Sequence, residues 1–494
     1  MTIVHRVLYP EPISSLEEYL ARGGGVGLEA ALSKTPEEII AELEASGLRG
    51  RGGAGFPTGR KWRTVRDYAA ADRRSSIVVN GAEGEPGTFK DRTILRTSPY
   101  PVLEGALIAA RALDADWIAV AMKRSFVAEV ARVRAAIEEV KAAGWADGIR
   151  LETFEGPGEY LYGEETALLE TIDGRYPFPR VAPPFRRGDV EVVESAADAS
   201  SHSGLSAHVE MAGPGGDTDV PPTLVDNVET LANVARILGR GAAWFRTEGT
   251  EQSPGTIVCT VTGSVQRAGV GEVIMGTPLR EVIEAIGGGA RPGHRIKAVL
   301  SGVSSAILTE DQLDTPVSYE GMAAVGSGLG SAGFQVFDDH DDIAAVAAGV
   351  SRFLAVESCG QCVPCKVDGI ALSQLLADLS RSQVTEAEFA KIGRLASTVG
   401  ERARCSLATQ HQDVIGSILE RFGPELRAHV GRYGDGAVEP LLVAELADIQ
   451  GDVAVLDERH RDKQPDWSFG DEYSGKVPAE RFGDHRHPLP LDDA

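Results

Sequence analysis

The chain has 494 residues, and 49 Lys and Arg against 73 Asp and Glu give it a formal net charge of −24. That length predicts about three domains, and its 43% hydrophobic and 25% charged residues exclude wholesale disorder. The acidic excess argues against nucleic acid or an anionic membrane as a partner, because clustered Lys and Arg hold both. We expect a cytoplasmic protein, since the start lacks a secretory signal and charges interrupt the most apolar stretch, 103–122.

Residues 1–240 predict an α/β domain that begins with a short arm, 1–34. Thr35 and the Pro-Glu-Glu that follows it open a capped helix, which ends at Gly47. Helical and β-branched segments then alternate to about residue 237, as α/β layers do. These segments are a helix from 59, a strand at 76–80, a helix at 102–113, a strand at 117–122 and a helix at 127–143.

Three further regions follow in the chain. Residues 250–335 contain short strands separated by glycines and one helix of about nine residues, which predicts a small α+β module. Residues 341–430 have apolar positions at helical spacing and predict a helical bundle. Residues 434–494 are an acidic, proline-containing tail that has little periodicity apart from 439–456, so we expect it to run over a surface and not build a core.

Four of the five cysteines fall in the predicted bundle. Cys359, Cys362 and Cys365 follow the C-x₂-C-x₂-C spacing, and Cys405 comes 40 residues after them. Such a set suits a [4Fe-4S] cluster, in which each iron takes one thiolate. Structural zinc sites usually pair two C-x₂-C knuckles, so zinc is the weaker alternative, followed by unligated thiols. Cys259 lies in an apolar strand and is expected in the core.

A glycine-dense loop links the first two predicted helices. The segment from Gly50 to Gly55 fits G-x-G-x-x-G, but a helix precedes it where the dinucleotide-binding fingerprint needs a strand. Bare amides, Arg49, Arg51 and a helix start just beyond still suit a phosphate or a flat ring. The alternative is a flexible turn with solvated arginines. Lys61 falls in the first turn of the next helix.

Two more segments place polar groups beside this loop. Asn80 and the carboxylates Glu83 and Glu85 come directly after a predicted strand, where α/β folds bind ligands. Glu164 and Glu165 precede a helix, where they can cap amides or face a ligand's hydroxyls. Together with the glycine loop, these segments predict one binding site.

The motifs GLRGRGGAGFPTGRKW, EGEPGTFKDR, GEETALLETIDG, DNVET and ESCGQCVPC occur in this order. From about residue 30 to 425 the chain thus resembles the NADH-oxidising flavoprotein subunit of respiratory complex I (51 kDa or F subunit) and the related subunits of NAD-linked hydrogenases and formate dehydrogenases. The resemblance implies an α/β flavin-binding domain, a small ubiquitin-like (SLBB) α+β domain and a helical bundle that holds an iron–sulfur cluster.

The resemblance also implies bound FMN, NAD(H) as substrate and a [4Fe-4S] cluster as the next electron carrier. Flavin supplies the chemistry, so no catalytic side chain is assigned. NADH is expected to stack near Phe56 and Phe185, with Glu85 and Glu165 at its polar groups. The positions expected around FMN are Gly50, Arg51, Gly52, Gly53, Gly55, Lys61, Asn80, Glu83, Gly163, Glu164, Asp226 and Asn227.

Four positions depart from the family pattern. Ala82 and Asp226 stand where the family has Asp and Asn near the flavin, and Thr64 and Ala182 where it has an aromatic residue and Lys near the nucleotide. Loss of the ring and of the cation would each cost about 1 kcal/mol of binding free energy. FMN binding is therefore expected to be better preserved than NADH binding.

The leading hypothesis is an FMN-dependent electron-input subunit that oxidises NADH, or reduces NAD+, and relays single electrons through the cluster. The expected partners are a thioredoxin-like [2Fe-2S] subunit and a larger iron–sulfur subunit, which could hold the chain at the inner face of a membrane. One alternative is a paralogue that exchanges electrons with a ferredoxin or flavoprotein instead of NADH. Another is a structural subunit whose metal site only ties helices together.

Overall fold

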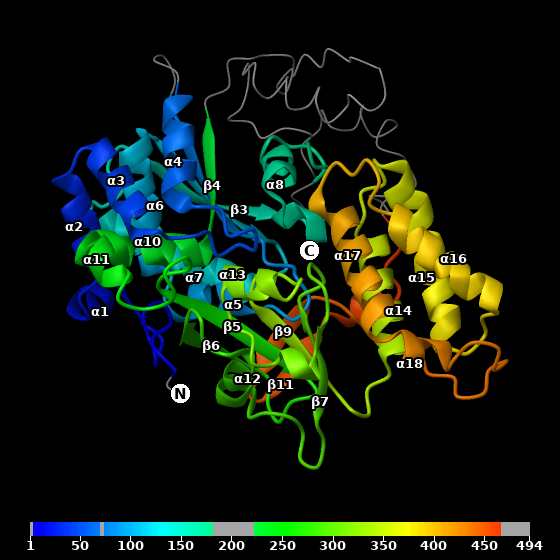
Figure 1. Cartoon of the computed structure of the whole chain (residues 1–494). Coiled ribbons are helices and arrows are strands. Elements are labelled where there is room, and N and C mark those ends of the chain that lie inside the picture. The colour runs from blue at the N-terminus through cyan, green and yellow to red at the C-terminus, as the bar shows by residue number, and fades with distance from the viewer. Residues whose placement is uncertain (1–2, 70–73, 181–221, 466–494) are drawn as a thin grey trace.

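A parallel four-stranded sheet organises the N-terminal half of the computed structural model, which describes residues 3–69, 74–180 and 222–465 (Figure 1). The strand order is β3-β2-β1-β4, and every neighbouring pair is parallel. The strands are β1 (Ser76–Gly81), β2 (Trp117–Lys123), β3 (Arg150–Gly156) and β4 (Thr223–Asn227). The buried apolar runs in β1 and β2 suit strands that are covered on both faces.

Helices pack around this sheet. The α6 and α10 backbones lie close together, because a Cβ on Gly105 would sit 2.0 Å from the Leu231 carbonyl oxygen. Thr35 caps α3 through the expected capping box, and Gly47 ends that helix at φ +69°. The helices are α3 (Pro36–Ser46), α4 (Thr58–Asp67), α5 (Lys90–Thr97), α6 (Tyr100–Leu113), α7 (Val127–Ala142), η1 (Tyr160–Gly163), α8 (Glu165–Ile172), α10 (Val228–Arg240) and α11 (Ala242–Phe245).

The expectation of a plain arm at 1–34 is wrong, because this segment forms α1 (Leu16–Ala21) and α2 (Val26–Leu32). Both helices are too short for a helical period to stand out in the sequence. They are held by tertiary contacts: the buried carboxylate of Glu104 accepts hydrogen bonds from the Tyr19 hydroxyl and from the amides of Gly25 and Leu28.

A five-stranded mixed sheet of order β6-β5-β9-β7-β8 follows. The nine-residue helix expected among these strands is α12, and the last strand, β9, runs past residue 335 to Asp338. The elements are β5 (Thr256–Gly263), β6 (Gly269–Ile274), α12 (Leu279–Gly287), β7 (Ile296–Ser301), β8 (Leu308–Thr309), η4 (Glu310–Gln312), α13 (Tyr319–Ala324) and β9 (Gly333–Asp338).

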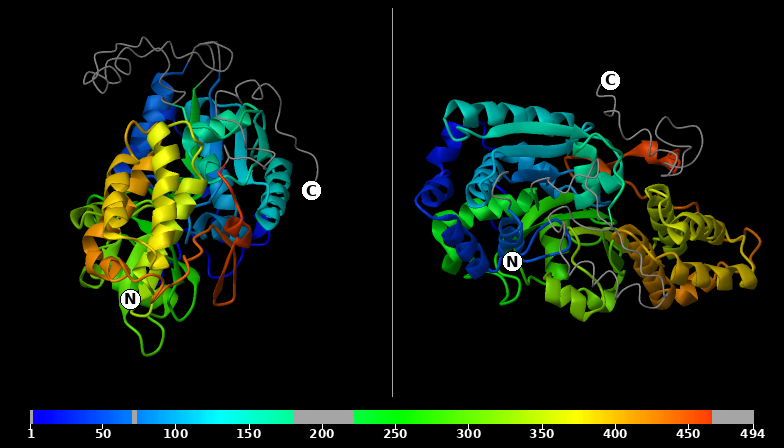
Figure 2. Two further views of the ribbon diagram at one scale, coloured as in Figure 1. Left: turned by 90° about the vertical axis from the view of Figure 1, so that its right-hand side faces the viewer. Right: turned by 90° about the horizontal axis from the view of Figure 1, so that it is seen from above.

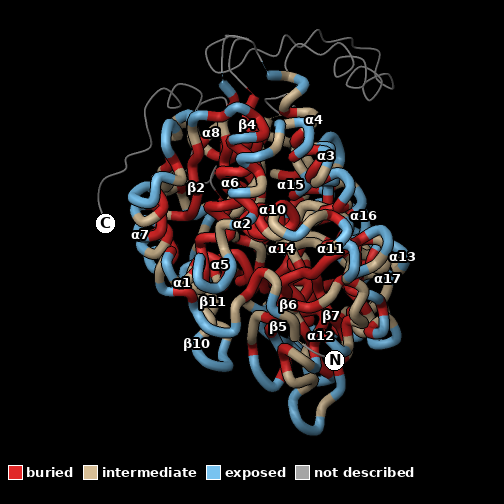
Figure 3. The backbone as a smooth tube through the Cα atoms, turned by 90° about the vertical axis from the view of Figure 1, so that its left-hand side faces the viewer, coloured by how far each residue is buried: buried red, intermediate tan, exposed pale blue. Residues whose placement is uncertain are grey.

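A group of helices stands beside both sheets, at the right of Figure 1. Thr385 and Glu388 form the capping box of α16, as their spacing predicts. The view from above in Figure 2 shows these helices beside the rest of the fold, and Figure 3 shows burial concentrated in the interior strands and helices. The helices are α14 (Ile343–Val356), α15 (Val363–Ser380), α16 (Glu386–Thr398), α17 (Ser406–Arg421) and α18 (Gly423–Arg427).

The segment 441–463, called the strap below, returns across the molecule and contains β10 (Leu446–Gln450), β11 (Val453–Leu456) and η5 (Glu458–Arg461). The expectation that the tail builds no core is wrong for this segment. Leu446 is buried, and its carbonyl accepts a hydrogen bond of 2.8 Å from Arg92. The strap is held by hydrogen bonds and ion pairs to residues distant in sequence, which the periodicity noted at 439–456 did not predict.

In the part of the chain that the structure describes, no helix is both long enough and apolar enough to cross a bilayer.

The contact between the strap and α14 depends on a glycine. A Cβ on Gly349 would lie 2.2 Å from the Leu441 carbonyl oxygen, whereas a Cβ on Gly393 of α16 would meet nothing within 4 Å. We predict that Gly349→Ala lowers the unfolding temperature, because overpacking costs about 1–3 kcal/mol. Gly393→Ala should raise it, by about 0.5–1 kcal/mol of helix stability. Thermal unfolding of both variants tests this prediction. A higher unfolding temperature for Gly349→Ala as well as for Gly393→Ala would refute the close contact between Gly349 and Leu441.

Candidate redox site

The carboxyl ends of β1 and β4 meet at the point where the strand order changes direction. Strands β2 and β3 extend the sheet on one side of β1, and β4 lies on its other side. Asn80 is in register with Asn227, and Val79 with Asp226. Open α/β sheets bind ligands in the crevice at such a switch point. The predicted site residues from two distant segments are therefore brought together.

The glycine loop lies over these strand ends. A Cβ on Gly52 would come within 3.2 Å of the Asn227 Cβ, so a side chain there would crowd the crevice. Gly55 has φ +62°, and a Cβ on it would lie 2.4 Å from the Tyr319 ring. The loop therefore presents bare main chain beside the strand ends, which fits a flat ring or a phosphate.

Arg51 points into the fold. Its side chain is buried, and its guanidinium donates to the carbonyls of Thr256 (2.9 Å) and Pro254 (3.1 Å). The Glu229 carboxylate lies 3.9 Å away. These contacts attach the loop to β5. Because they occupy the guanidinium, only the main chain of Arg51 is left to make the predicted contact with FMN.

Lys61 reaches the strand ends from α4. Its ammonium donates to Glu165 at 3.0 Å and to the Val225 carbonyl at 2.6 Å. Burial opposes the charge, but the attraction of Glu165 and Asp226 outweighs it and raises the pKa of Lys61. Asp226 accepts from the Trp62 indole at 2.7 Å, and burial raises its pKa to about 6.

The adjacent carboxylates of Glu164 and Glu165 have different environments. Glu164 caps α8 and accepts from the amides of Thr166 and Ala167, at 3.0 and 2.8 Å. One oxygen of Glu165 bonds Lys61, but its buried Oε1 has no hydrogen-bond partner. A buried carboxylate oxygen without a partner is costly, so this atom fits a ligand that donates a hydrogen bond.

The segment after β1 supplies three more predicted residues. Asn80 donates to the Gly163 carbonyl at 2.8 Å, which ties β1 to η1. Glu83 accepts from the amides of Asp91 and Arg92, and burial with the nearby Asp91 charge raises its pKa to about 7. Glu85 accepts a hydrogen bond from the Tyr160 hydroxyl.

Sequence reasoning missed a buried charge network under the loop. The Lys90 ammonium contacts Asp91 (2.8 Å), Glu229 (2.9 Å) and the Asn227 side-chain oxygen (3.3 Å). The Asn227 amide donates to Asp91 at 2.7 Å, so the network fixes the Asn227 side chain beside Gly52. Lys90 and Asp91 belong to the EGEPGTFKDR motif, and this motif was the signal in the sequence that could have indicated the network.

The expected nucleotide side is described only in part. Phe56 is 44% exposed, with the Arg60 guanidinium 5.9 Å from its ring centre. The Thr64 hydroxyl donates a hydrogen bond to the Arg60 carbonyl in the same helix. Ala82 is buried. Phe185 and Ala182 lie outside the described residues, so their expected contacts with NADH stay predictions.

The four cysteines converge from two segments. Cys359 and Cys362 precede α15 and Cys365 lies in its first turn, whereas Cys405 precedes α17. The Gln361 amide donates to the Cys359 sulfur, and the Arg404 main-chain N–H donates to the Cys362 sulfur, both at 3.3 Å. Burial is the main cause that raises the pKa of the Cys365 and Cys405 thiols, to about 11 and 12.

The spread of the sulfurs favours a cluster over zinc. A single tetrahedral zinc ion draws its sulfur ligands to about 3.8 Å from one another. Among the described residues, the one group of three or more ligand atoms within 4.8 Å of each other is His294, Asp338, Asp339 and His340, which includes none of the cysteines. Four cysteines at wider spacing match one thiolate per iron.

Tyr160 joins the two halves of the site. Its hydroxyl donates to Glu85, and its amide donates at 3.0 Å to Glu357, which directly precedes Ser358 and Cys359. Burial, then the Glu85 charge, raises the pKa of Tyr160, so its phenol stays protonated as the donor. Its ring packs against Phe353 of α14, with centroids 5.3 Å apart.

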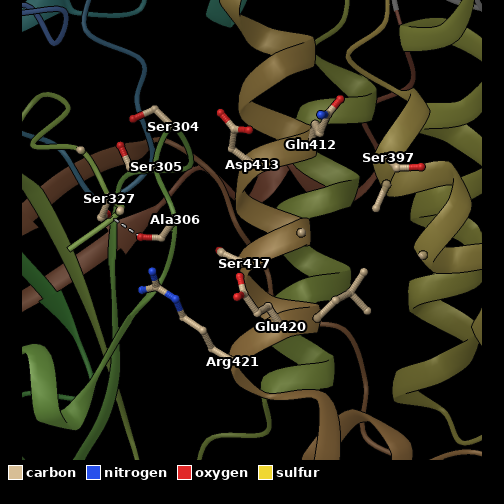
Figure 4. A pocket seen from close by; sticks show the side chains of 16 residues that line it. Ser304, Ser305, Ala306, Ser327, Ser397, Gln412, Asp413, Ser417, Glu420 and Arg421 are labelled. Atoms are coloured by element: carbon tan, nitrogen blue, oxygen red, sulfur yellow. Dashed lines mark hydrogen bonds between the residues drawn. The ribbon is translucent and has the colours of Figure 1, made fainter. Parts of the chain in front are cut away.

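A cavity of about 720 Å³ lies elsewhere, between α17 and the loops of the five-stranded sheet (Figure 4). Its walls are mostly serine, glycine and polar side chains of α17, including Asp413 and Glu420. No predicted site residue lines it, so it plays no part in the redox site.

Three segments match known families. Residues 43–236 match the Nuo51 FMN-binding domain, residues 258–306 the SLBB domain, and residues 345–429 the NADH-ubiquinone oxidoreductase-F iron-sulfur binding region. By fold and by site, the chain is therefore an iron–sulfur flavoprotein.

Curated relatives narrow this class. The F subunit of NADH-quinone oxidoreductase from Streptomyces coelicolor is 35% identical, over 85% of this chain and 89% of that protein. NADP-reducing hydrogenase subunit HndC of Solidesulfovibrio fructosivorans is 34% identical, over 84% of this chain and 81% of its own length. A crystal structure of an NAD+-reducing [NiFe]-hydrogenase superposes with a TM-score of 0.71 at 30% identity, covering 87% of this chain and 68% of that one.

The chain belongs to the F-subunit family of NADH-quinone oxidoreductase. The resemblance drawn from its motifs is confirmed, and so are the fold class and the FMN and [4Fe-4S] cofactors that it implied.

The cysteine assignment has a direct test. Cys405→Ser should abolish the [4Fe-4S] cluster, because one iron loses its soft ligand. Iron content and the low-temperature EPR spectrum of the reduced protein measure this. Cys259→Ser is the matched control, since this thiol is buried in β5 away from the four ligands and should leave the iron content unchanged. An unchanged cluster signal in Cys405→Ser would refute the assignment.

The raised pKa of Asp226 predicts a pH dependence. The folded protein retains this proton up to about pH 6, whereas the unfolded chain releases it near pH 4, so stability falls as pH rises through that window. Asp226→Asn keeps an acceptor for Trp62 and should gain about 3 kcal/mol of stability above pH 6. Asp448→Asn should act oppositely, because Arg96 pairs with this carboxylate and the pKa of Asp448 is lowered. Unfolding temperatures of both variants, measured from pH 4 to 8, test these predictions. If the unfolding temperatures of the wild type and of Asp226→Asn change in parallel with pH, the raised pKa of Asp226 is contradicted.

Proposed function

We propose that this chain is the electron-input subunit of a multi-subunit redox complex, which oxidises NADH, or reduces NAD+, and relays electrons one at a time. FMN, when bound, accepts the hydride and converts a two-electron transfer into two one-electron transfers. The observation that best supports this function is the link through Tyr160, which contacts Glu85 of the crevice and Glu357 of the cysteine segment.

The residues of the crevice have distinct proposed tasks. The main chain at Gly50, Gly52 and Gly53 would receive the phosphate and ribityl chain of FMN, because no side chain blocks its approach. Lys61 supplies a positive charge near the end of β4, where it contacts the Val225 carbonyl. Asn80 and Asn227, held by their own hydrogen bonds, would complete the polar wall.

Two carboxylates face the proposed nucleotide position. The buried Glu165 Oε1 lacks a partner and can accept from a ligand amide or hydroxyl. Glu85 is oriented by Tyr160 and by the Val303 amide at 2.7 Å. Burial raises the pKa of Glu85, against the hydrogen bonds that its carboxylate accepts. Phe56 would offer the exposed ring for stacking.

The four cysteines would hold the cluster that takes electrons from the flavin. Two separate segments supply them, so cluster binding would tie α15 to α17. The alternative, in which a protein and not NADH exchanges electrons with the flavin, rests on Thr64, Ala82 and Ala182, which depart from the family pattern. It is disfavoured, since the relatives are named for NADH or NADP chemistry.

The relatives are named as subunits, which supports a proposal about the partners and the location of this chain. A single cluster must pass its electron on, and we infer a thioredoxin-like [2Fe-2S] subunit and a larger iron–sulfur subunit as partners. We place the chain in the cytoplasm, at a membrane only through such partners.

Anaerobic titration with NADH tests the function. The purified protein should carry FMN, and NADH should bleach its visible absorbance. Glu165→Gln should retain FMN but raise the KM for NADH about tenfold, equivalent to about 1.4 kcal/mol for one charge-assisted hydrogen bond. The control is Glu155→Gln on β3, whose carboxylate pairs with the exposed Arg134 outside the crevice. Bound FMN that NADH fails to bleach would instead support the protein-donor alternative.

A further inference from the structure

A second group of metal-ligating side chains lies at one end of the five-stranded sheet, and the redox site does not use it. Strands β7 and β9 are antiparallel, and Ile296 is in register with Asp338, so the loop before β7 meets the turn after β9. The Asp339 amide donates to the Arg295 carbonyl at 3.0 Å and holds the two segments together. The ligand atoms that converge there, all within 4.8 Å of one another, belong to His294, Asp338, Asp339 and His340.

The distances among these atoms suit one metal ion. Nitrogen and oxygen ligands at about 2.0–2.1 Å from a tetrahedral zinc ion lie about 3.3 Å from each other. The Asp339 Oδ1 atom lies 3.3 Å from His294 Nδ1 and 3.9 Å from His340 Nδ1. The two Nδ1 atoms are 2.5 Å apart, so they would have to separate by about 0.8 Å around the ion. The His340 side chain is 73% exposed, which leaves it room to do so.

The facing imidazoles distinguish this group from an ordinary acidic cluster. A hydrogen bond between the two Nδ1 atoms needs one nitrogen as donor and the other as acceptor. A metal ion would instead use the lone pair of both. Imidazole nitrogen is a preferred ligand of zinc and of its neighbours among the transition metals, whereas calcium and magnesium prefer oxygen ligands. The donor set therefore favours a transition metal.

The surroundings hold the two carboxylates in place. Asp338 is buried, and its oxygens accept from the His340 amide at 3.0 Å and from the Arg291 guanidinium at 2.7 Å. Asp339 accepts from the Arg295 amide at 3.2 Å through the same Oδ1 that faces His294. Hydrogen bonds of this kind orient the ligands of metal sites. Asp338, with both oxygens engaged, acts as a positioning residue beside the three ligands.

The turn that contains the group connects two parts of the fold. It begins at the end of β9, and Asp342 then caps α14, the helix that leads to the cysteine segment. Lys297 of β7 donates to the Asp341 carbonyl and pairs with Glu425 of α18 at 3.0 Å. An ion at this turn would join its two histidine-bearing segments and restrict how the sheet moves against the helices.

We propose that His294, Asp339 and His340 bind a divalent transition metal of the zinc class, with water as the fourth ligand, and that this ion braces the turn between β9 and α14. The site is independent of the proposed function, because it involves neither the flavin crevice nor the four cysteines.

Calorimetric titration with zinc tests the site, on the full-length chain purified without a histidine tag and with its cofactors bound. His340→Ala and Asp339→Asn should each weaken the tightest zinc site at least about tenfold. His5→Ala is the matched control, since His5 is an exposed histidine outside the group, and it should bind zinc as the wild type does. Excess magnesium should not compete. Equal zinc affinity in the wild type and both site variants would overturn the proposal.

X-ray absorption at the zinc edge identifies the ligands of the bound ion. We expect two imidazoles and only nitrogen or oxygen neighbours, at about 2.0–2.1 Å. Sulfur neighbours at about 2.3 Å would place the ion on cysteines and overturn the site.

Thermal unfolding tests the bracing role. Zinc should raise the unfolding temperature of the wild type and of His5→Ala but not that of His340→Ala, because an ion that binds only the folded state stabilises it. A wild-type unfolding temperature that does not respond to zinc would overturn the bracing role.

Discussion

The structure depends on the contacts of Tyr160, which connect the crevice of the parallel sheet to the segment that contains the cysteines. Tyr160 donates through its hydroxyl to Glu85 and through its amide to Glu357, and its ring packs against Phe353. The crevice at the parallel sheet and the cysteines of the helical unit have to stay at a fixed separation, because electron transfer weakens steeply with distance. Tyr160 is partly buried, and the contacts of its hydroxyl, its amide and its ring supply that rigidity.

The strap strengthens the same junction from outside. Lys463 donates to Glu357 at 2.6 Å and His460 lies 3.2 Å from it, so the carboxylate that holds Tyr160 also holds the strap. At its other end, Asp448 pairs with Arg96 at 2.6 Å. The strap therefore connects the cysteine segment to helices of the flavin side, and these contacts restrict movement between the two units.

Buried charges position the flavin crevice at an energetic cost. Lys90, Asp91 and Glu229 are almost fully buried, and replacing such networks by apolar residues is often neutral or stabilising in other proteins. Here the network orients Asn227 and lies under the glycine loop, while Arg51 and Glu229 connect that loop to β5. The charges fix the shape of a binding surface that apolar packing alone would leave less defined.

Local sequence determined the elements and the chemistry. The capping signals of α3 and α16, the apolar runs of β1 and β2 and the C-x₂-C-x₂-C spacing each depend on neighbours within a few residues. Pattern alone could therefore predict an α/β sheet, a helical unit and a cluster, and the motifs identified the family.

Tertiary structure decided where the side chains of the predicted site residues point. Arg51 turns inward because carbonyls some 200 residues away accept its hydrogen bonds, and Glu164 caps a helix while its neighbour Glu165 reaches Lys61. The strap and the short helices α1 and α2 also exist only through distant contacts. Residue types and spacing contain no record of such contacts, since they arise only when remote segments pack.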